Sequence, residues 1–493
     1  MPPQSPIELT GSASRLAGDP PPLSDELIDS LRTIGEVITD EQDTANASRD
    51  WWPLALHWAL QGAVPRRAAA VVRPTSTDGV ARVLRACNAE GVAVTAAGGR
   101  SGVVGGTVPL AGGVILDLTE LAGIESVDAE SGLVVARTGT FGPDLERELR
   151  EEHGLTVGHY PQSFDLATVG GWVAARGAGQ YSTRYGKIER IVAGLEVVLA
   201  DGSIVTTGGA PAAATGPDLT QLFVGSEGTL GVITKVWLRA WPTPAFEQRA
   251  SFNFADLAAG LDACRQILRR GATPAVLRLY DAIESARGHG GDGEQCTLLV
   301  LDEGDPAIVD ATMRVVAESC AAHGAVETGN APVDAWMEHR NDTSALQALT
   351  RKGFVVDTLE IAAPWSALDD VVEATTTAML AVPHARAASC HLSHSYVDGA
   401  CLYFTFAATP PANEVDSTYV ALWDAGQRAV LASGGNLSHH HGVGLVRDRF
   451  MGDALGGGMD VFAAVKRALD PTGILNPGKL GLPSSLDVAP WPA

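Results

Sequence analysis

The sequence lacks the features that mark membrane proteins and disulfide-stabilised secreted proteins. No apolar run approaches the ~18 residues of a membrane-spanning helix. Residues 1–19 are polar and proline-rich, without the basic and apolar segments of a signal peptide, and residues 491–493 are not a peroxisomal signal. The six cysteines include no CxxC pair and mostly lie in apolar segments. We therefore expect reduced, buried thiols, no membrane span and a cytoplasmic location.

The sequence is also poor in positive charge. It carries 35 Lys and Arg residues against 58 Asp and Glu residues, a formal net charge of −23 at pH 7. This excess argues against binding nucleic acid or an anionic membrane through bulk charge, but it leaves open a local basic pocket for an anionic substrate. With 493 residues, 45% of them hydrophobic, the chain can build more than one core. We expect at least two domains and a small-molecule or lipid-like substrate, and a homodimer is compatible with the sequence.

Helix and strand patterns begin near Ala69, after a segment, residues 1–25, whose Pro, Ser and Gly content predicts disorder. A strand at 70–74 is followed by apolar residues at positions 80, 83, 84 and 87, the spacing of one helix face, and Gly91 ends that helix. A second strand starts at 92–94. Further on, we predict strands at 114–118 and 133–136, a helix at 142–153, and a hairpin at 196–207 that turns at Asp201-Gly202.

Pro242 and Pro244 mark a domain boundary. Beyond them, strands are predicted at 249–254, 275–280, 297–301, 355–361 and 401–406, and helices at 256–270, 307–323 and 368–380. This alternation predicts a sheet covered by helices. The tail, residues 461–480, resembles a helix that stops at Asp470-Pro471.

Three segments combine glycines with hydroxyl side chains: residues 97–106, 161–171 and 225–234. Small residues let backbone amides approach a pyrophosphate closely, although each segment alone is also compatible with an ordinary loop. The first segment directly follows a strand. It does not match GxGxxG and no helix pattern follows it, so a Rossmann site is disfavoured.

In this order and spacing, the three segments resemble the vanillyl-alcohol-oxidase type of FAD-binding fold. Within that fold, the chain resembles the alkyldihydroxyacetonephosphate synthases. The resemblance covers residues 47–480 and is specific at 47–54, 158–161, 216–219, 396–406 and 438–444. It implies an α+β protein: a two-lobed FAD-binding domain at 26–245, an α/β cap domain at 246–440 whose antiparallel sheet is covered by helices, and a segment, 441–493, that returns to the FAD-binding domain.

The resemblance also implies which residues hold FAD. They are Ala96, Ala97, Gly98, Gly99, Arg100, Ser101, Gly102, Gln162, Ser163, Thr168, Ala175, Arg176, Gly177, Ala178, Glu227, Gly228, Thr229, Leu230, Gly231, Val232 and Ile233. Some relatives tether the flavin through a histidine in the first of these loops. Arg100 occupies that position here, so we expect non-covalent FAD.

Candidate catalytic residues lie in the second half of the chain. Neighbouring side chains diverge on a strand or helix, so the run His439, His440 and His441 can converge only on an irregular loop. A surface loop or a chance metal binder are the plainer interpretations, but histidine can also pass protons near neutral pH. By pattern, Tyr403 is a core tyrosine, and Arg278 is a charge inside a strand that needs a partner. The resemblance implies that the histidine run lies at the active site, that Tyr403 is the catalytic tyrosine, and that Arg278 clamps an anionic group.

For the reaction, the resemblance implies that flavin N5 reacts with a substrate carbon bearing an oxygen substituent, in a net transferase reaction where an acyl chain leaves and an alcohol adds. The alternative is oxidation of a D-2-hydroxy acid or another alcohol by hydride transfer to N5. A flavin-binding protein without activity is disfavoured, since mere binding needs neither Tyr403 nor Arg278. Leu346 stands where a second substrate arginine is expected, so we expect a changed substrate, with Arg340 or Arg351 as substitutes.

A metal site is a further alternative, because flavin-dependent D-2-hydroxy acid dehydrogenases share the cofactor fold and often carry one. Four histidines, His391, His394, His440 and His441, could approach one another. Against a metal, His440 replaces the usual glutamate of that group, and a carboxylate normally completes such a site. We therefore expect no metal.

Overall fold

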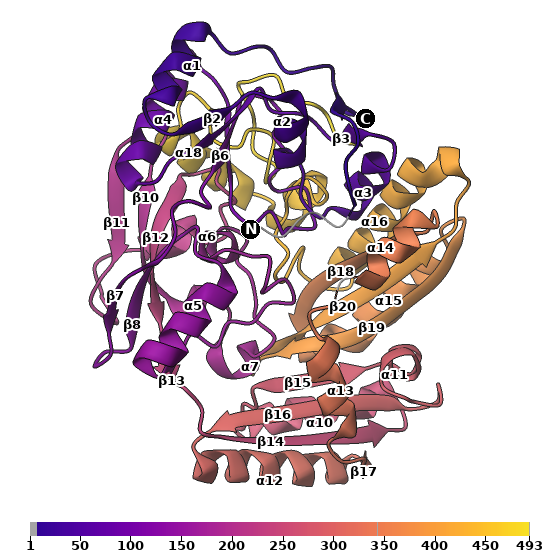
Figure 1. The fold of residues 1–493 in the computed structure, drawn as a ribbon. Coiled ribbons are helices and arrows are strands. Elements are labelled where there is room, and N and C mark those ends of the chain that lie inside the picture. The colour runs from indigo at the N-terminus through magenta and orange to yellow at the C-terminus, as the bar shows by residue number, and fades with distance from the viewer. Residues whose placement is uncertain (1–6, 343, 493) are drawn as a thin grey trace.

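The computed structural model describes residues 7–342 and 344–492 of the chain. It consists of two bodies, an N-terminal domain and a cap domain built on one large sheet, and the C-terminal segment returns to the first body (Figure 1). The strands form sheets of four, five and seven members together with two short pairs. The architecture is the α+β fold that the sequence predicts.

The first lobe of the N-terminal domain is a four-stranded sheet in the order β2-β4-β6-β5. Its strands are β2 (Glu36–Ile38), β4 (Ala70–Arg73), β5 (Val94–Ala97) and β6 (Val114–Asp117). Helix α4 (Thr77–Glu90) connects β4 to β5 and buries the apolar face that the sequence predicts. Gly91 ends α4 in the left-handed region at φ 64°, where a residue without a Cβ is favoured.

The second lobe is a five-stranded antiparallel sheet in the order β11-β10-β12-β8-β7. Its strands are β7 (Ile124–Asp128), β8 (Leu133–Arg137), β10 (Val192–Val198), β11 (Ile204–Gly208) and β12 (Val232–Arg239). The predicted hairpin is present as β10 and β11. The helix predicted at 142–153 is α5 (Gly142–Glu148), which continues as one wider turn over 149–153.

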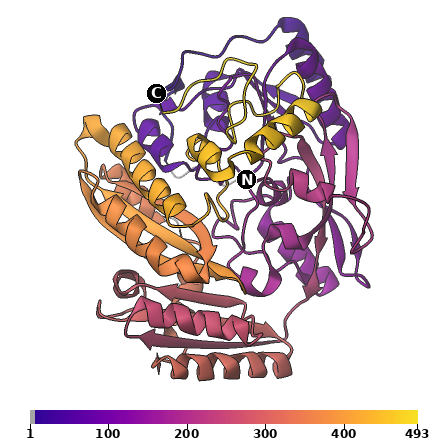
Figure 2. The ribbon, with the colours of Figure 1, turned by 180° about the vertical axis from the view of Figure 1, so that it is seen from behind.

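The cap domain is a seven-stranded sheet in the order β17-β14-β16-β15-β19-β20-β18. Its strands are β14 (Phe246–Phe254), β15 (Val276–Tyr280), β16 (Cys296–Gly304), β17 (Val326–Glu327), β18 (Val355–Pro364), β19 (Ala385–Ser395) and β20 (Gly399–Ala408). Helices α10 (Leu257–Arg269), α12 (Pro306–Ala322), α15 (Leu368–Leu380) and α16 (Val415–Ala432) cover one face, as Figure 2 shows from behind. The other face is turned toward the N-terminal domain.

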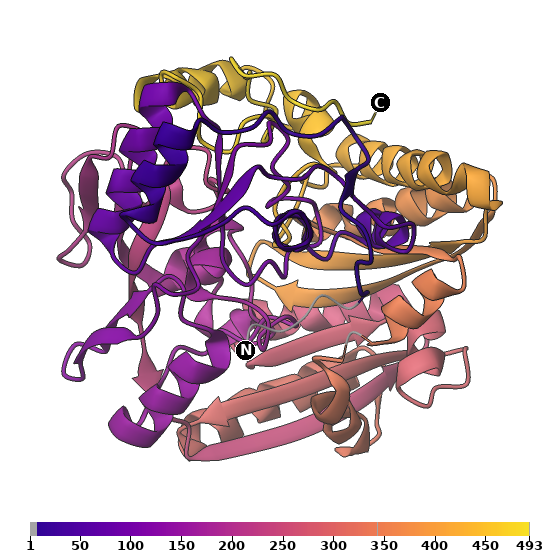
Figure 3. The ribbon, with the colours of Figure 1, turned by 45° about the horizontal axis from the view of Figure 1, so that its top comes forward.

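The C-terminal segment packs on the N-terminal domain (Figure 3). Helices α17 (Met451–Leu455) and α18 (Gly458–Leu469) precede a bridge between Leu475 and Val94 of β5. Lys466 is buried in this contact and donates to the carbonyl oxygen of Thr229 at 2.8 Å.

Residues 7–24 pack against the N-terminal domain, whereas composition predicts disorder for residues 1–25. Ile7 and Leu9 are buried in a small apolar cluster with Leu56, and β1 (Ala13–Ser14) pairs with β3 (Ala63–Val64). A few apolar side chains and the short strand pairing anchor this polar, proline-rich stretch, and a composition argument averages such residues away. Residues 1–6 of that prediction lie outside the described residues.

Shorter elements complete the chain. They are α1 (Asp25–Arg32), α2 (Glu41–Ala47), α3 (Pro53–Ala59), β9 (Leu155–Thr156), α6 (Val169–Ala174), α7 (Ser182–Tyr185), α8 (Ile188–Ile191), α9 (Leu219–Phe223), β13 (Trp241–Pro242), α11 (Ala282–Gly288), α13 (Ala331–His339) and α14 (Ser344–Arg351). All six cysteines are buried and outside any disulfide, as predicted. None of the helices in the described ranges is long and apolar enough to cross a membrane.

Candidate active site

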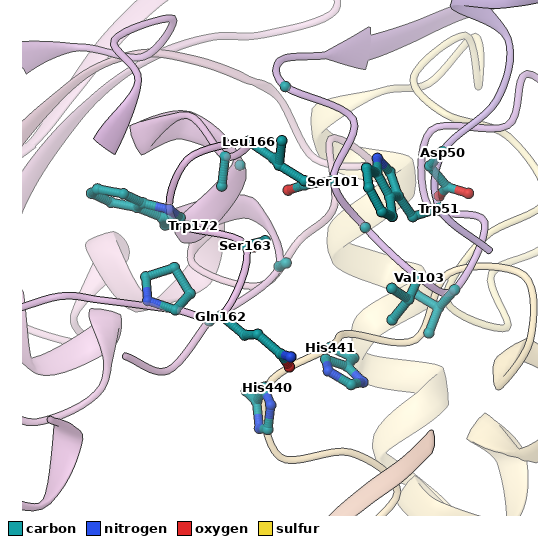
Figure 4. Close-up of a pocket in the computed structure, with 18 of the residues that line it drawn as sticks. Asp50, Trp51, Ser101, Val103, Gln162, Ser163, Leu166, Trp172, His440 and His441 are labelled. Carbon is teal, nitrogen blue, oxygen red and sulfur yellow. The ribbon is translucent and has the colours of Figure 1, made fainter. Parts of the chain in front are cut away.

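A cavity of about 580 Å³ lies between the N-terminal domain and the cap sheet. Loops at 96–107, 159–180 and 227–233 line it from the first domain, and β15, β18, β19, β20, α13, α14 and the histidine run line it from the other side. Gln162 and the imidazoles of His440 and His441 point toward one another across this space (Figure 4). The cavity therefore joins the predicted cofactor loops to the predicted catalytic residues.

The first glycine-rich loop is shaped by close backbone approach. A Cβ on Gly98 would lie 2.2 Å from Thr168 Oγ1, and a Cβ on Gly99 would lie 1.9 Å from the carbonyl oxygen of Leu166. Both distances are far below van der Waals contact, so only glycine fits at these positions. Arg100, which stands at the position of the tethering histidine in some relatives, adopts φ 52°. Its Nη1 lies 3.3 Å from Asp117 Oδ2, so an ion pair holds its side chain.

Most of the predicted cofactor residues line the cavity, and three do not: Arg176, Thr229 and Leu230. Leu230 is fully buried in the core of the second lobe, and Thr229 donates to the carbonyl oxygen of Ser226 at 2.7 Å. Arg176 Nε lies 3.8 Å from Glu189 Oε1. Thr229 and Leu230 point into the core and Arg176 is exposed, while their neighbours line the cavity, a difference that a contiguous sequence match cannot resolve.

Buried polar atoms without a protein partner surround the cavity. They are Asp50 Oδ2, Thr107 Oγ1, Thr138 Oγ1, His159 Nδ1 and Nε2, Thr168 Oγ1 and Trp172 Nε1. Buried polar groups are almost always hydrogen-bonded, so such a collection along one cavity indicates a polar ligand. Burial also lowers the pKa of His159 to about 3, which keeps its ring neutral. These atoms, together with the glycine-rich loops, fit a long polar cofactor such as FAD.

A row of side chains crosses three neighbouring cap strands and β15 toward the cavity. In the strand register, Glu360 of β18 lies opposite Tyr403 of β20, Tyr403 lies opposite His391 of β19, and His391 lies opposite Tyr280 of β15. Directly opposite residues share one face of a sheet. The rings of Tyr403 and Tyr280 each stack on His391 at 4.9 Å between centroids. The sheet itself thus sets the spacing of the catalytic candidates.

His391 links a buried carboxylate to a predicted arginine. Its Nδ1 lies 2.7 Å from Glu284 Oε2, and its Nε2 lies 2.7 Å from Arg278 Nη2, whose guanidinium also donates to Tyr280 Oη at 2.9 Å. An arginine can only donate, so Nε2 of His391 accepts and Nδ1 carries the proton. Burial lowers the pKa of His391, consistent with this neutral form.

Arg340 is a second guanidinium on the cavity wall. The guanidinium carbons of Arg278 and Arg340 lie 5.5 Å and 5.7 Å from the ring centroid of Trp336. Arg340 Nη1 donates to Gln180 Oε1 at 3.1 Å, and neither arginine forms an ion pair with a carboxylate in the described part of the chain. Leu346 also lines the cavity and is 38% exposed, whereas Arg351 is not among the lining residues. Of the two substitutes predicted for the missing arginine, the structure therefore places Arg340 at the cavity.

The three consecutive histidines do not all face the cavity, as expected for an irregular loop. His440 and His441 line the cavity, whereas His439 is buried behind it. His439 Nε2 lies 2.7 Å from Tyr396 Oη, and its Nδ1 lies 2.8 Å from His440 Nδ1. Burial lowers the pKa of His439 and of His440 well below the usual value, so both rings are neutral at pH 7.

The nitrogens of His394, His439 and His440 lie within 4.8 Å of one another, which is a spacing compatible with a metal ion. Several of these nitrogens already have partners. Ser182 Oγ lies 2.7 Å from His394 Nδ1, and the other two imidazoles bond to each other through Nδ1. No carboxylate belongs to this group.

Sequence reasoning missed the acidic residues behind the site. Glu360 is fully buried, and its carboxylate contacts the buried guanidinium of Arg447 and lies 3.1 Å from His441 Nδ1. A signal was present, because Glu360 is a charge inside an apolar strand, the same argument that singled out Arg278. Sequence reasoning also missed Glu284 and the aromatic residue Trp336, which lie in short helices without such a signal.

Comparison with known proteins agrees with this site. Residues 68–208 match the family model described as FAD binding domain, and residues 243–480 match that of the C-terminal domain of FAD linked oxidases. The FAD-linked oxidoreductase YgcU of Escherichia coli O157:H7, described as uncharacterized, is 32% identical over 92% of this chain and 98% of its own length. The chain belongs to the FAD-linked oxidase family. Its cofactor is accordingly FAD.

More distant relatives point in two directions. Alkyldihydroxyacetonephosphate synthase of Trypanosoma brucei brucei is 27% identical over 94% of this chain and 82% of its own length. Glycolate oxidase subunit GlcD of Bacillus subtilis is 29% identical over 83% of this chain and 88% of its own length. A solved structure of alkyldihydroxyacetonephosphate synthase superposes with a TM-score of 0.78 at 24% identity, covering 96% of this chain and 91% of that chain. This likeness confirms the two-domain fold of the vanillyl-alcohol-oxidase type.

Proposed function

We propose that this flavoenzyme oxidises a hydroxyl-bearing carbon of a small anionic substrate, with FAD bound non-covalently. One observation carries the proposal: two guanidiniums without carboxylate partners, those of Arg278 and Arg340, share a cavity with neutral imidazoles and the phenol of Tyr403. In a chain with a net charge of −23, cations left uncompensated on a cavity wall favour a bound anion.

The residues around the cavity have complementary roles. Arg278 and Arg340 bind the substrate anion beside Trp336. This binding orients the oxygen-bearing carbon toward the cofactor loops. The neutral imidazole of His440 accepts the hydroxyl proton, because burial lowers its pKa and leaves the ring unprotonated. Burial raises the pKa of Tyr403, so the phenol keeps its proton and donates a hydrogen bond to the reacting oxygen. When bound, FAD supplies the acceptor for the hydrogen that leaves the carbon with its electron pair.

The predicted FAD contacts fit this assignment. The cavity-lining residues of the loops at 96–102, 162–168, 175–178 and 227–233 hold the cofactor, and Arg100, in its ion pair with Asp117, replaces a tethering histidine. We propose no metal, because the histidine nitrogens beside the cavity bond to one another and to hydroxyl groups.

A synthase reaction is the second candidate. It is favoured by the resemblance of Arg278, Tyr403 and the histidine run to the alkyldihydroxyacetonephosphate synthases, one of which matches 94% of this chain. Leu346 opposes it, since the resemblance places a second arginine for the phosphate dianion at this cavity position, and a synthase would have to use Arg340, which already bonds to Gln180, in its place. Losing one partner of a buried charge pair costs about 2–5 kcal/mol, or roughly 30- to 4,000-fold in binding.

Anaerobic mixing of the yellow holoenzyme with defined compounds tests the proposal. We expect a small 2-hydroxy acid to bleach the flavin, and its neutral methyl ester, the matched control, to bleach it far more slowly. Turnover of acylated dihydroxyacetone phosphate and a fatty alcohol without net bleaching would replace oxidation by the synthase reaction. In that case Leu346→Arg should raise kcat/KM for the phosphate substrate. If the acid and its ester bleach the flavin at the same rate, the proposed anion-binding role of Arg278 and Arg340 is wrong.

A further inference from the structure

A half-buried carboxylate of the FAD-binding domain, on the cavity wall, holds one end of the histidine loop, defined as residues 438–444. Glu227 Oε1 accepts the backbone amide of Val443 at 2.6 Å, and Oε2 accepts that of Gly444 at 2.8 Å. Glu227 itself adopts φ 48°, a left-handed conformation that glutamate rarely adopts and that the surrounding fold must enforce. A Cβ on Gly442 would lie 2.5 Å from Glu227 Oε1, so the loop fits closely on this carboxylate.

A second carboxylate, fully buried in the cap sheet, holds the other end. Glu360 Oε1 accepts the backbone amides of His440 at 3.0 Å and His441 at 2.7 Å, and the hydroxyl of Ser438 at 2.7 Å. Burial alone would raise the pKa of Glu360, but Arg447 and His441 hold it well below its usual range. Glu360 therefore stays ionised, and charge-assisted bonds to amides are about twice as strong as neutral ones.

The two carboxylates belong to different parts of the molecule. Glu227 lies in the loop that also lines the cavity at 227–233, and Glu360 lies opposite Tyr403 in the cap sheet. Between them they accept four backbone amides of a loop that has no helix or strand of its own. Other contacts hold the loop through the carbonyl oxygens of residues 439 and 442, which accept from Lys187 and Arg447. The two carboxylates are the acceptors for its amides at 440, 441, 443 and 444.

We propose that Glu227 and Glu360 are positioning residues that jointly fix the histidine loop. The FAD-contact segment and the cap sheet then together determine where His440 and His441 stand relative to the substrate. The catalytic consequence rests on the proposed function, but the structural claim does not. A misplacement of about 1 Å in a reacting group can lower a rate by about 10²-fold.

The test compares holoenzyme variants by hydrogen exchange of the loop and by anaerobic flavin reduction. Glu227→Gln keeps the size of the side chain but sets an NH2 group against a backbone N–H, so at least one of the two bonds is lost. We expect faster exchange at amides 443 and 444, and flavin reduction slower by about 10²-fold at saturating substrate with KM unchanged. The rate is taken per bound FAD, because Glu227 is also among the proposed FAD contacts. Glu227→Asp, which keeps both acceptor oxygens, should recover part of both effects.

Asp470→Asn is the matched control. Asp470 is another buried carboxylate that holds a turn, through the amides of Gly473, Ile474 and Leu475 at 3.0, 3.1 and 2.8 Å, and it does not line the cavity. Its variant should speed exchange at 473–475 and leave flavin reduction at the wild-type rate.

Glu360→Gln should affect amides 440 and 441 in the same way. It leaves the buried Arg447 without its carboxylate, so Ser438→Ala, which removes one loop contact and keeps that ion pair, serves if the first variant does not fold. If the loop amides of Glu227→Gln exchange hydrogen at the wild-type rate, Glu227 does not hold the histidine loop, and this conclusion does not depend on the measured activity. Faster exchange with a wild-type reduction rate would overturn the positioning role. If no hydroxy acid reduces the flavin of the wild type, the proposed function is wrong. The hydrogen-exchange data still show whether Glu227 and Glu360 hold the histidine loop.

Discussion

The change Tyr403→Phe isolates one hydroxyl group in the centre of the site. The phenylalanine ring keeps the stacking distances of 4.9 Å to His391 and 5.9 Å to His440, so the packing of the row across the cap sheet survives. The stability cost is the hydrogen bonding of one hydroxyl group, about 1 kcal/mol. Loss of a hydrogen-bond donor to an oxygen that carries developing charge in the reaction costs ~10²–10³-fold in rate, or about 2.7–4 kcal/mol. Activity should thus fall far more than stability.

Tyr280→Phe is the matched control, because Tyr280 stacks on the same imidazole at the same 4.9 Å. Its hydroxyl accepts from Arg278 Nε at 2.9 Å, so its loss should raise KM for an anionic substrate and leave the limiting rate of reduction nearly unchanged. The assay is rapid anaerobic mixing, with FAD content and Tm measured on the same preparations. If Tyr403→Phe reduces its flavin within ~10-fold of wild type, below the range for loss of a donor to the reacting oxygen, the phenol is a packing residue and the assignment is wrong.

Other expected outcomes follow from the same geometry. Heat or acid should release free FAD from the denatured chain, since Arg100 stands at the tethering position; flavin that stays attached would contradict this. Replacing His440 and His441 by alanine should abolish most flavin reduction without changing metal content, and about one zinc, iron or manganese per chain, lost with activity, would contradict the metal-free site. Burial alone would raise the pKa of Glu284, but His391 holds it at about 2 instead of 4.5. A lowered folded-state pKa gives stability that is present above pH 4.5 and is lost as the pH falls toward 2, so the Tm values of wild type and Glu284→Gln should differ at pH 7 and converge through that window. A constant difference across that window would contradict this carboxylate pairing.

The sequence was most informative where local pattern sets structure. The periodic apolar residues of α4 predicted its buried face and its end. The alternation of strands and helices in the cap domain predicted β14, α10 and β15 with ends within three residues. Two large cap elements, β19 and α16, were not predicted. Residues 385–395 are small and polar and show no alternation, because this strand is sandwiched between β15 and β20 and faces the cavity.

Within the site, pattern failed where geometry departs from regular structure. His391 and His394 are three residues apart, so in an unbroken strand they would face opposite sides. A register shift between Leu392 and His394 lets both line the cavity, and a bulge of this kind leaves no sequence signature. The contacts of Glu227 with residues 443 and 444 span more than 200 positions, which no local argument reaches.

The distribution of charge around the cavity also bears on how substrate and base cooperate. The carboxylates near the site are engaged behind it, Glu284 with His391 and Glu360 with Arg447, so the cavity wall presents guanidiniums and neutral imidazoles. Burial lowers the pKa of His391 and of His394, and the positive charge of Arg278 lowers both further. On the proposed function, a substrate anion bound at Arg278 offsets that charge and raises the proton affinity of the neighbouring rings. His394 packs on the proposed base, His440, with 5.1 Å between ring centroids. An anion at Arg278 therefore lowers the electrostatic cost of a positive charge in this histidine cluster, which couples binding of the anion to removal of the hydroxyl proton and disfavours neutral alcohols.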